Sequence, residues 1–320
     1  MIKYLKFLTV LALCMGISLI VGAQIPVKES DTNRVNITYG KKKTYKGKYQ
    51  TLTLDIYFPK QNAGKNYPLA LFMHGGGFVN GNKDAMKGHC MQMADSGFVA
   101  VSINYRKGWD QLSVMKGCDS LDKGGFSSAT YRAMQDANSA LKFLLKNADQ
   151  FHINPNWIFV GGSSAGAITA LGISYLSDDY IAKAYKGEID SLGKLNESPS
   201  NFAIKGIANL WGALPDSTLI TKKTALPTIS FHGTADVTVP YNKGSYIPCP
   251  QLPEVYGSAV IYRQTRAANQ AAILYTAVGG KHGPTEHTKN LVVSHIANFF
   301  HQVMQGKTNS GSYTNIKTSK

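Results

Sequence analysis

Apolar and polar residues follow two different patterns along this chain, and the pattern changes at Pro59. From Thr51 to Phe58 every second residue is apolar, which is the period of a strand with one buried face and predicts an antiparallel start to a sheet. Beyond Pro59 the apolar residues gather in short, nearly continuous runs, as in strands that are buried on both faces. These runs are 69–73, 98–103, 157–160, 204–210, 226–231 and 271–278.

Helical patterns lie between these runs. The clearest has its apolar residues on one stripe between Ala133 and Leu145, with Ser127 or Ser128 as its N-cap. The alternation of strand and helix predicts an α/β fold with a mostly parallel central sheet and helices on both faces. The polar, glycine-punctuated stretch 177–200 interrupts the alternation, and we expect it to form a small cap insertion. Weaker helical patterns cover 84–95, 164–175, 255–268 and 287–303.

The two ends of the chain differ from the rest. Residues 1–23 have the pattern of a secretory signal peptide, in which two lysines precede an uncharged run over 7–21 that ends in small residues. As a helix this run would be about 22 Å long, short of the roughly 30 Å of a bilayer core, so we expect a secreted or periplasmic protein without a stable membrane anchor. The polar tail 307–320 is expected to be disordered, which leaves residues 24–306 as a single large domain.

The chain is strongly basic, with 34 Lys and Arg against 19 Asp and Glu among its 320 residues. Because 43% of the residues are hydrophobic and 17% are charged, the composition is that of a globular protein, which excludes wholesale disorder. The basic residues are scattered apart from the run 41–43, so we interpret them as a solvated surface and expect no nucleic-acid partner.

A Gly-x-Ser-x-Gly motif centred on Ser164 lies between an apolar run and a helix of small residues. A serine on a tight strand-to-helix turn adopts a strained backbone conformation, which is tolerated when the residues two positions away, Gly162 and Gly166, have no side chain. The turn exposes the hydroxyl, so Ser164 is the predicted nucleophile. Ser163 is the adjacent alternative, but a motif centred there has an alanine in place of the second glycine.

The segment His74–Gly77, a histidine followed by three glycines, comes directly after another apolar run. Consecutive glycines let the backbone approach a ligand and present bare N–H groups to it. His74 precedes the serine motif in the chain, and we interpret it as a structural histidine that bonds the loop.

Together these two motifs resemble the α/β-hydrolase superfamily, in particular its carboxylesterases and lipases of the His-Gly-Gly-Gly type, over residues 45–303. The resemblance implies the α/β-hydrolase fold and a reaction that needs no cofactor and no metal. It implies that the backbone N–H groups of Gly76, Gly77 and Ala165 bind the oxyanion. It also implies an order along the chain of serine, then acid, then histidine.

The acid and the base are therefore sought beyond Ser164. Asp236 follows an apolar run across a glycine turn and looks like the family's acid, with Asp216 as the alternative. His282 lies on a glycine-flanked loop after the next apolar run, so it is the predicted base. The other histidines of this half are interpreted as structural: His232, His287, His295 and His301.

These residues predict a serine hydrolase that cleaves carboxylic esters through an acyl-enzyme. The loops expected around the site are polar and lack an apolar lid, which favours short acyl esters, acetyl or feruloyl, on small molecules or on polysaccharide over long-chain lipids. A peptidase on the same fold and a non-catalytic binding module of the same ancestry are the alternatives. Four loop aromatics either stack on a sugar or phenolic group or pack within the loops: Trp109, Phe126, Tyr246 and Tyr256.

Three cysteines remain once the signal peptide is removed, and no Cys or His spacing suggests a zinc site. Cys90 and Cys118 are close in sequence, so we predict a disulfide between them, worth about 3 kcal/mol on the loop-entropy model. Cys249 is the rival partner for either.

Overall fold

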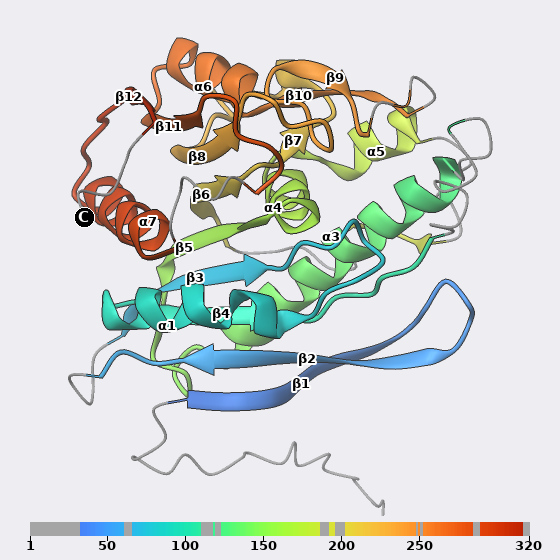
Figure 1. Ribbon diagram of the computed structural model, residues 1–320. Helices are drawn as coiled ribbons and strands as arrows, with labels where there is room; N and C mark the ends of the chain where they lie inside the picture. The colour runs from blue at the N-terminus through green and yellow to red at the C-terminus, as the bar shows by residue number, and fades with distance from the viewer. Residues whose placement is uncertain are drawn as a thin grey trace, which may run out of the picture. The chain divides into compact units, whose positions relative to one another are not determined.

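A twisted β-sheet with helices on both faces is the centre of the described part of the chain (Figure 1). The computed structural model describes residues 33–60, 66–109, 118, 123–185, 192–195, 202–247, 249, 252–283 and 289–315. Within these residues nine strands make up the sheet. In spatial order they are β1 (Asn33–Lys43), β2 (Tyr49–Tyr57), β4 (Val99–Ile103), β3 (Tyr67–Met73), β5 (Ile153–Ser163), β6 (Ile204–Leu210), β8 (Thr228–Gly233), β11 (Ala272–Ala277) and β12 (Gly311–Thr314).

The direction of the strands changes where the hydrophobic pattern of the sequence changes. β2 is antiparallel to both β1 and β4, whereas every other neighbouring pair is parallel. The antiparallel start, the mostly parallel sheet and the α/β fold class are thereby confirmed. A small second sheet joins β7 (Ala213–Leu214), β10 (Glu254–Gly257) and β9 (Lys243–Ser245).

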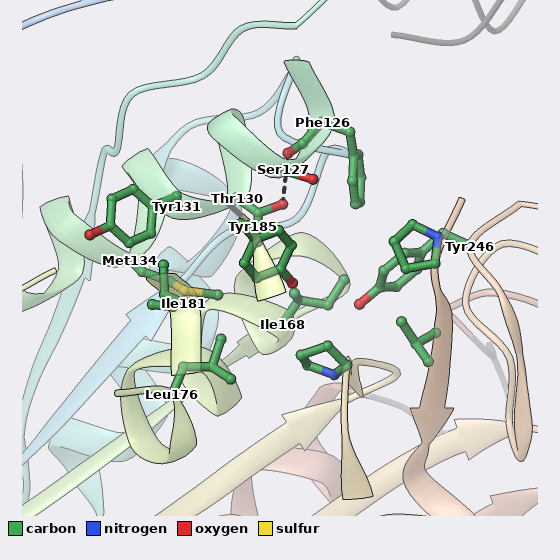
Figure 2. A pocket seen from close by; sticks show the side chains of 13 residues that line it. Phe126, Ser127, Thr130, Tyr131, Met134, Ile168, Leu176, Ile181, Tyr185 and Tyr246 are labelled. Atoms are coloured by element: carbon green, nitrogen blue, oxygen red, sulfur yellow. Dashed lines mark hydrogen bonds between the residues drawn. The ribbon is translucent and has the colours of Figure 1, made fainter. Parts of the chain in front are cut away.

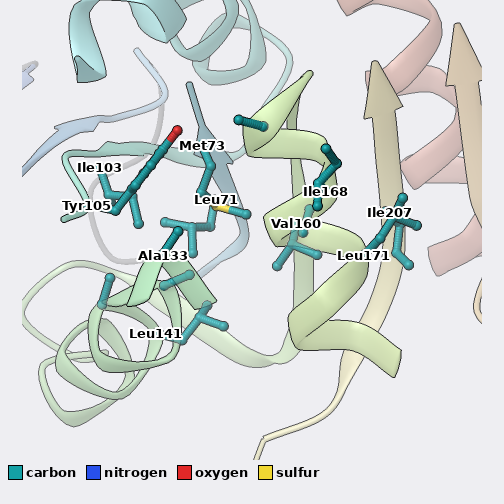
Figure 3. Packing of buried hydrophobic residues seen from close by; sticks show 14 of the residues in the cluster. Leu71, Met73, Ile103, Tyr105, Ala133, Leu141, Val160, Ile168, Leu171 and Ile207 are labelled. Carbon is teal, nitrogen blue, oxygen red and sulfur yellow. The ribbon is translucent and has the colours of Figure 1, made fainter. Parts of the chain in front are cut away.

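Neighbouring residues of one strand pack into different layers, because successive side chains of a strand point to opposite faces. Leu71 of β3 and Val160 of β5 join the core under one face, where Figure 3 shows them beside Leu141 and Leu171. Phe72 and the other side chains of the opposite face form a second core. The first face is covered by α3 (Lys123–Lys146), α4 (Ala165–Tyr175) and α6 (Ser258–Ala267), and the second by α1 (Lys87–Asp95) and α7 (Lys289–Met304).

α3 begins ten residues before the stripe that predicted it, so Ser127 and Ser128 lie inside the helix and are not its N-cap. The reason is a tertiary contact outside the stripe. Phe126, in the first turn, packs edge-on against Phe78 and against Trp109, with ring centroids 5.8 and 5.3 Å away. This aromatic contact stabilises a helical start that periodicity alone does not reveal.

The expected cap insertion contains one further helix, α5 (Asp178–Ala184), which Ser177 caps by accepting from the backbone N–H of Tyr180 at 3.1 Å. Ile181 and Leu195 pack against Tyr131 and Met134 of α3 in a small separate core. The described part of the insertion therefore lies against the beginning of α3. No helix in the described ranges is both long enough and apolar enough to cross a bilayer.

The expectation of a disordered tail is wrong for residues 311–314, which form the edge strand β12. Its backbone pairs in parallel with β11, and Tyr313 stacks on Tyr275 with 5.1 Å between ring centroids. Polar composition was a poor guide here because the free edge of the sheet supplies backbone hydrogen bonds to any side-chain sequence. The signal peptide predicted over 1–23 lies outside the described residues.

The disulfide joins Cys118 to Cys249, with 5.4 Å between their Cα atoms, so the predicted Cys90–Cys118 pair is wrong and Cys90 is a buried free thiol. Closeness in sequence misled the prediction because the sheet separates the two. Cys90 belongs to the core of the α1 and α7 face, whereas Cys118 and Cys249 contact the core of the opposite face. The bond closes a loop over a separation of 131 residues, which the loop-entropy model values at about 5 kcal/mol.

Candidate active site

Ser164 occupies the turn between β5 and α4 with a backbone φ of 54° and ψ of −120°. This left-handed conformation is strained for a residue with a side chain, and close packing enforces it. A Cβ on Gly162 would lie 2.6 Å from the carbonyl carbon of Gly166, and one on Gly166 would overlap the backbone of Met73. The two flanking glycines are therefore needed because the strand, the turn and the helix approach within backbone contact.

Three side chains from the carboxyl ends of β5, β8 and β11 meet at this turn. The hydroxyl of Ser164 lies 2.8 Å from Nε2 of His282, and Nδ1 of His282 lies 2.7 Å from Oδ2 of Asp236. Because the carboxylate can only accept, Nδ1 carries the proton, so Nε2 accepts from the serine hydroxyl. The structure thus brings together the predicted nucleophile, base and acid in one hydrogen-bonded line.

Asp236 is held as a carboxylate by donors on both of its oxygens. Oδ1 accepts from the backbone N–H groups of Thr238 and Val239 at 2.8 and 3.0 Å, and Oδ2 accepts from His282 and His232. Burial alone would raise the pKa of Asp236. The hydrogen bonds from His232, His282 and Val239 outweigh that effect and hold the pKa well below its ordinary value.

His232 continues the line away from the serine, and its tautomer is fixed by its neighbours. Its Nε2 lies 3.1 Å from two acceptors, Oδ2 of Asp236 and the carbonyl of Val239, so Nε2 bears the proton. Its Nδ1 therefore accepts from the Ser258 hydroxyl at 2.7 Å, and that hydroxyl accepts from the Asn209 amide at 3.0 Å. His232 is thus bonded on both ring nitrogens and holds the Asp236 carboxylate in place, as expected of a structural histidine.

The glycine loop after β3 has two peptide units whose carbonyls are held in place. The Nδ1–H of His74 donates to the Gly75 carbonyl at 2.6 Å, and the Gly76 carbonyl accepts from the backbone of Val79 and Asn80 at 3.0 and 2.9 Å. In a trans peptide the N–H points opposite to the C=O. The N–H groups of Gly76 and Gly77 are therefore turned out of the loop, and both residues are exposed.

This loop lies directly against the serine turn. A Cβ on Gly75 would be 3.3 Å from the Cβ of Ser164. Trp109 donates its indole N–H to the Gly77 carbonyl at 2.8 Å and fixes the far side of the loop. The N–H of Ala165, the first residue of α4, lies at the helix N-terminus, where the helix dipole adds positive potential. The glycine loop, through Gly75, and the start of α4 thus both lie next to the Ser164 turn.

His74 is fully buried and stacks on Tyr105, with 4.3 Å between ring centroids. Burial lowers its pKa to about 4, so the imidazole is neutral at physiological pH. A neutral ring whose Nδ1–H is committed to the Gly75 carbonyl agrees with the structural role that the sequence predicted. The Tyr105 hydroxyl donates to the carbonyl of His74 itself at 2.7 Å and anchors the start of the loop.

The alternative residues lie elsewhere. Asp216 accepts from the backbone N–H and the hydroxyl of Thr218 at 2.8 and 2.7 Å, and it caps a short helical turn, Ser217–Leu219. His295 bonds the Tyr275 hydroxyl and His301 the Ser96 carbonyl, while His287 lies outside the described residues. In the described ranges no group of three or more His, Cys, Asp or Glu is arranged to hold a metal ion.

An apolar pocket with about 510 Å³ of empty space, its opening to solvent included, lies beside this site (Figure 2). Its wall includes Ile168, one helical turn beyond Ser164 on α4, and Phe126, which packs on Phe78 next to the glycine loop. Ser164, Asp236 and His282 are not part of its lining. The full lining is Phe126, Ser127, Thr130, Tyr131, Met134, Ile168, Leu176, Ile181, Tyr185, Pro215, Tyr246, Pro253 and Val255.

No sequence pattern pointed to Trp211, whereas Trp109 packs against the loops, which is one of the two arrangements expected from the sequence. Trp211 has a positive φ of 47°, and its ring faces His282 edge-on at 6.4 Å between centroids. A bulky residue in a left-handed conformation leaves no signal in the sequence. Trp109 was expected to stack on substrate or to pack within a loop. Its side chain is buried, its indole N–H donates to the Gly77 carbonyl, and the ring of Phe126 packs against it.

Known proteins resemble this chain in sequence and in fold. The carboxylesterase family matches residues 28–185. The neuroligin-like protein glit-1 of Caenorhabditis elegans is 33% identical over 118 residues, which cover 36% of this chain and 15% of that protein. Esterase-5C of Drosophila miranda is 31% identical over 135 residues, 42% of this chain and 23% of that protein. The chain thus spans less than a quarter of either relative.

Among solved structures, a truncated carbohydrate esterase from gut microbiota superposes with a TM-score of 0.56 at 18% identity, covering 86% of this chain and 97% of that one. At this identity the likeness concerns the fold. The chain therefore shares its α/β fold with this solved esterase, and its residues 28–185 match the carboxylesterase family.

Proposed function

We propose that this protein is a secreted serine hydrolase that cleaves short-chain carboxylic esters through a covalent acyl-enzyme. The observation that carries the proposal is the line from Ser164 through His282 to Asp236, with contacts of 2.8 and 2.7 Å. A serine hydroxyl is a weak nucleophile until an adjacent base removes its proton, and this geometry supplies the base and a group that orients it.

In the proposed acylation step the Ser164 Oγ attacks the ester carbonyl carbon while its proton passes to Nε2 of His282. The carbonyl oxygen becomes an oxyanion that accepts from the N–H groups of Gly76, Gly77 and Ala165. The imidazolium, stabilised by Asp236, then gives its proton to the departing alkoxide as the carbon–oxygen bond breaks. The products of this step are an alcohol and an ester of Ser164.

Deacylation repeats the sequence with water. His282 takes a proton from the water as its oxygen attacks the acyl carbon, and the same N–H groups hold the second oxyanion. When the intermediate collapses, the proton returns to the Ser164 oxygen and the carboxylic acid leaves. His282 and Ser164 are regenerated, so the cycle consumes one ester and one water.

Short acyl groups, acetyl first, on small molecules or on polysaccharide are the proposed substrates. A lipase that works at an oil interface needs a contiguous greasy surface around its site. In the described ranges the exposed large apolar side chains are few, and only Val237 and Val278 lie on the loops that carry Asp236 and His282. The full set is Val35, Tyr45, Tyr49, Met91, Val237, Val278 and Tyr313.

Secretion, or export to a periplasm, is supported by two features. The N-terminal pattern over 1–23 is that of a cleaved signal peptide. The disulfide between Cys118 and Cys249 is of the kind that forms and persists in oxidising compartments.

The test is hydrolysis of p-nitrophenyl esters from two to twelve carbons by the purified protein and two variants. Ser164→Ala should lower kcat/KM by about 10⁴- to 10⁶-fold, and Ser163→Ala, the matched control one residue away, should change it little. The chain-length profile should peak at about two to four carbons. Loss of activity in Ser163→Ala alone would contradict the assignment of the nucleophile. Absence of ester turnover would favour a binding module, and faster cleavage of a dipeptide anilide would favour a peptidase.

A further inference from the structure

The hairpin formed by β1 and β2 carries an unbalanced positive charge. Residues 33–54 contain six Lys and Arg and no Asp or Glu. Four of these lysines are exposed, and none of the four forms an ion pair with a carboxylate of the described residues. They are Lys41, Lys43, Lys46 and Lys48. The hairpin therefore offers ammonium groups that no carboxylate of the described residues neutralises.

Two exposed tyrosines lie among these lysines. Lys43 is paired directly across the strands with Tyr49, and the ammonium groups of Lys41 and Lys43 each lie 5.7 Å from the centre of the Tyr49 ring. Lys46 lies 5.4 Å from the centre of the Tyr45 ring. Tyr49 is 65% exposed and Tyr45 is 49% exposed. These five residues form what we term the lysine–tyrosine face.

This face is attached to the segment that holds the glycine loop. The Tyr45 ring lies over Gly108, where a side chain would overlap it. The N–H of Gly108 donates to the Phe78 carbonyl at 2.8 Å, and the next residue, Trp109, donates to Gly77. Figure 1 shows the hairpin turn extending toward the side of the sheet where β3 ends. The hairpin turn and the glycine loop of the candidate active site therefore lie on the same side of the sheet.

We propose that the lysine–tyrosine face is a docking surface for an acidic polysaccharide. Ammonium groups pair with the carboxylates of uronic acid units, and exposed aromatic rings bind the apolar faces of sugar rings. A chain with 34 Lys and Arg against 19 Asp and Glu adds long-range attraction for such a polyanion. The preference for polysaccharide over nucleic acid rests on the proposed function, because polysaccharides carry the esters that the site would cleave.

The test measures binding of polygalacturonate by isothermal titration calorimetry, using the full chain with Ser164→Ala in every sample so that no turnover occurs. The double variant Lys41→Gln/Lys43→Gln should bind about fivefold more weakly, with a weaker dependence on salt. The matched control Lys222→Gln/Lys223→Gln removes the same charge from an exposed turn elsewhere and should bind within about twofold of the parent. Tyr49→Ser should weaken binding while leaving the salt dependence unchanged, because it removes a ring and no charge.

Several results would overturn the proposal. Equal weakening by the two double variants would mean that net charge alone attracts the polymer. Tighter binding of a single-stranded oligonucleotide than of polygalacturonate at the same salt concentration would reject a polysaccharide partner. Binding of neutral dextran as tight as that of polygalacturonate would reject the role of the lysines. The lysine variants are also made with Ser164 intact, and these should hydrolyse p-nitrophenyl acetate at the rate of the wild type. A failure of the proposed ester hydrolysis is thereby distinguished from a failure of polysaccharide binding.

Discussion

The two loops that flank Ser164 begin alike and work differently. The loop after β3 starts with His74-Gly75, and β8 ends in His232-Gly233 just before the loop of Asp236, each histidine being fully buried. In the first loop the histidine donates to a backbone carbonyl and so aims backbone N–H groups. In the second it donates to the Asp236 carboxylate and so aims a side chain. The same His-Gly dipeptide at the end of a parallel strand thus orients backbone N–H groups in one case and the Asp236 carboxylate in the other.

The difference lies in what holds each loop. The glycine loop is held by lack of space, since a Cβ on Gly76 would overlap the backbone of Asn80, and φ there is 113°. The acid loop is held by a chain of side-chain hydrogen bonds that runs back to Ser258 and Asn209. A side chain that does not fit displaces the whole loop, whereas the loss of one hydrogen bond weakens the positioning of Asp236 only in part. We therefore expect substitutions in the two loops to differ in kind.

The largest effect within the two loops is expected from Asp236→Asn. An amide in place of the carboxylate removes the charge that stabilises the imidazolium and favours the wrong tautomer of His282, so kcat should fall by about 10³- to 10⁴-fold. Asp216→Asn is the matched control and should retain activity, because Asp216 caps a turn away from His282. Steady-state kinetics on p-nitrophenyl acetate checks both. Loss of activity in Asp216→Asn with retention in Asp236→Asn would move the acid to the earlier strand.

On the other side of the serine, Gly76→Ala should lower kcat by about 10²- to 10³-fold, since a displaced loop misdirects two oxyanion donors. Gly97→Ala is its control, because that glycine, in the turn after α1, has φ of 90° but nothing within 4 Å of an added Cβ. An alanine at the control position has the same strain of a positive φ, but its Cβ does not overlap another atom. If both variants lose activity equally, strain and not crowding governs the loop, and the contrast between the two loops fails.

His232→Leu should lower kcat by about a hundredfold with little change in KM, whereas His232→Gln should lower it by about tenfold. The glutamine amide retains a donor for Asp236, and leucine does not. If His232 served only in packing, the leucine and glutamine variants would not differ in kcat in this order. They would instead lower the thermal stability. His295→Gln, on the far side of β11, should leave kcat unchanged. Equal kcat values for the leucine and glutamine variants would contradict a positioning role.

A last effect concerns the stability of the glycine loop and leaves the rate of hydrolysis aside. Burial holds the pKa of His74 near 4 against an ordinary value of 6.5. The unfolded chain therefore takes up this proton first as the pH falls, so the stability that neutral His74 contributes is complete above about pH 6.5 and is lost toward pH 4, by about 3 kcal/mol. His74→Gln cannot titrate. Its deficit in the free energy of unfolding, measured in urea, should shrink between pH 7 and pH 4.5, and a constant deficit would show that His74 does not gain a proton in this range.

The sequence predicted the parts of the site that depend on local chemistry at strand ends. Ser164, Asp236 and His282 each follow an apolar run and a glycine turn, and parallel strands bring such turns to one edge of the sheet. It could not predict what depends on side chains from distant strands, such as the bond between Ser258 and His232 or the ring of Trp211 beside His282.

The wrong disulfide and the missed strand β12 have the same cause. Each depends on which face or edge of the sheet a segment reaches, and residue spacing does not encode this. Cys90 is near Cys118 in sequence yet on the other side of the sheet, while Cys249 is distant in sequence and adjacent in space. The tail strand exists because β11 would otherwise be a free edge.

The central claim is that Ser164 is the activated nucleophile, and covalent labelling tests it most directly. A fluorophosphonate reacts only with a serine whose proton an adjacent base removes, and it leaves a stable adduct. After reaction with the full chain, peptide mapping by mass spectrometry should place one adduct per chain on Ser164, and His282→Ala should prevent it. An adduct on Ser163, or equal labelling of the wild type and the His282→Ala variant, would contradict the account.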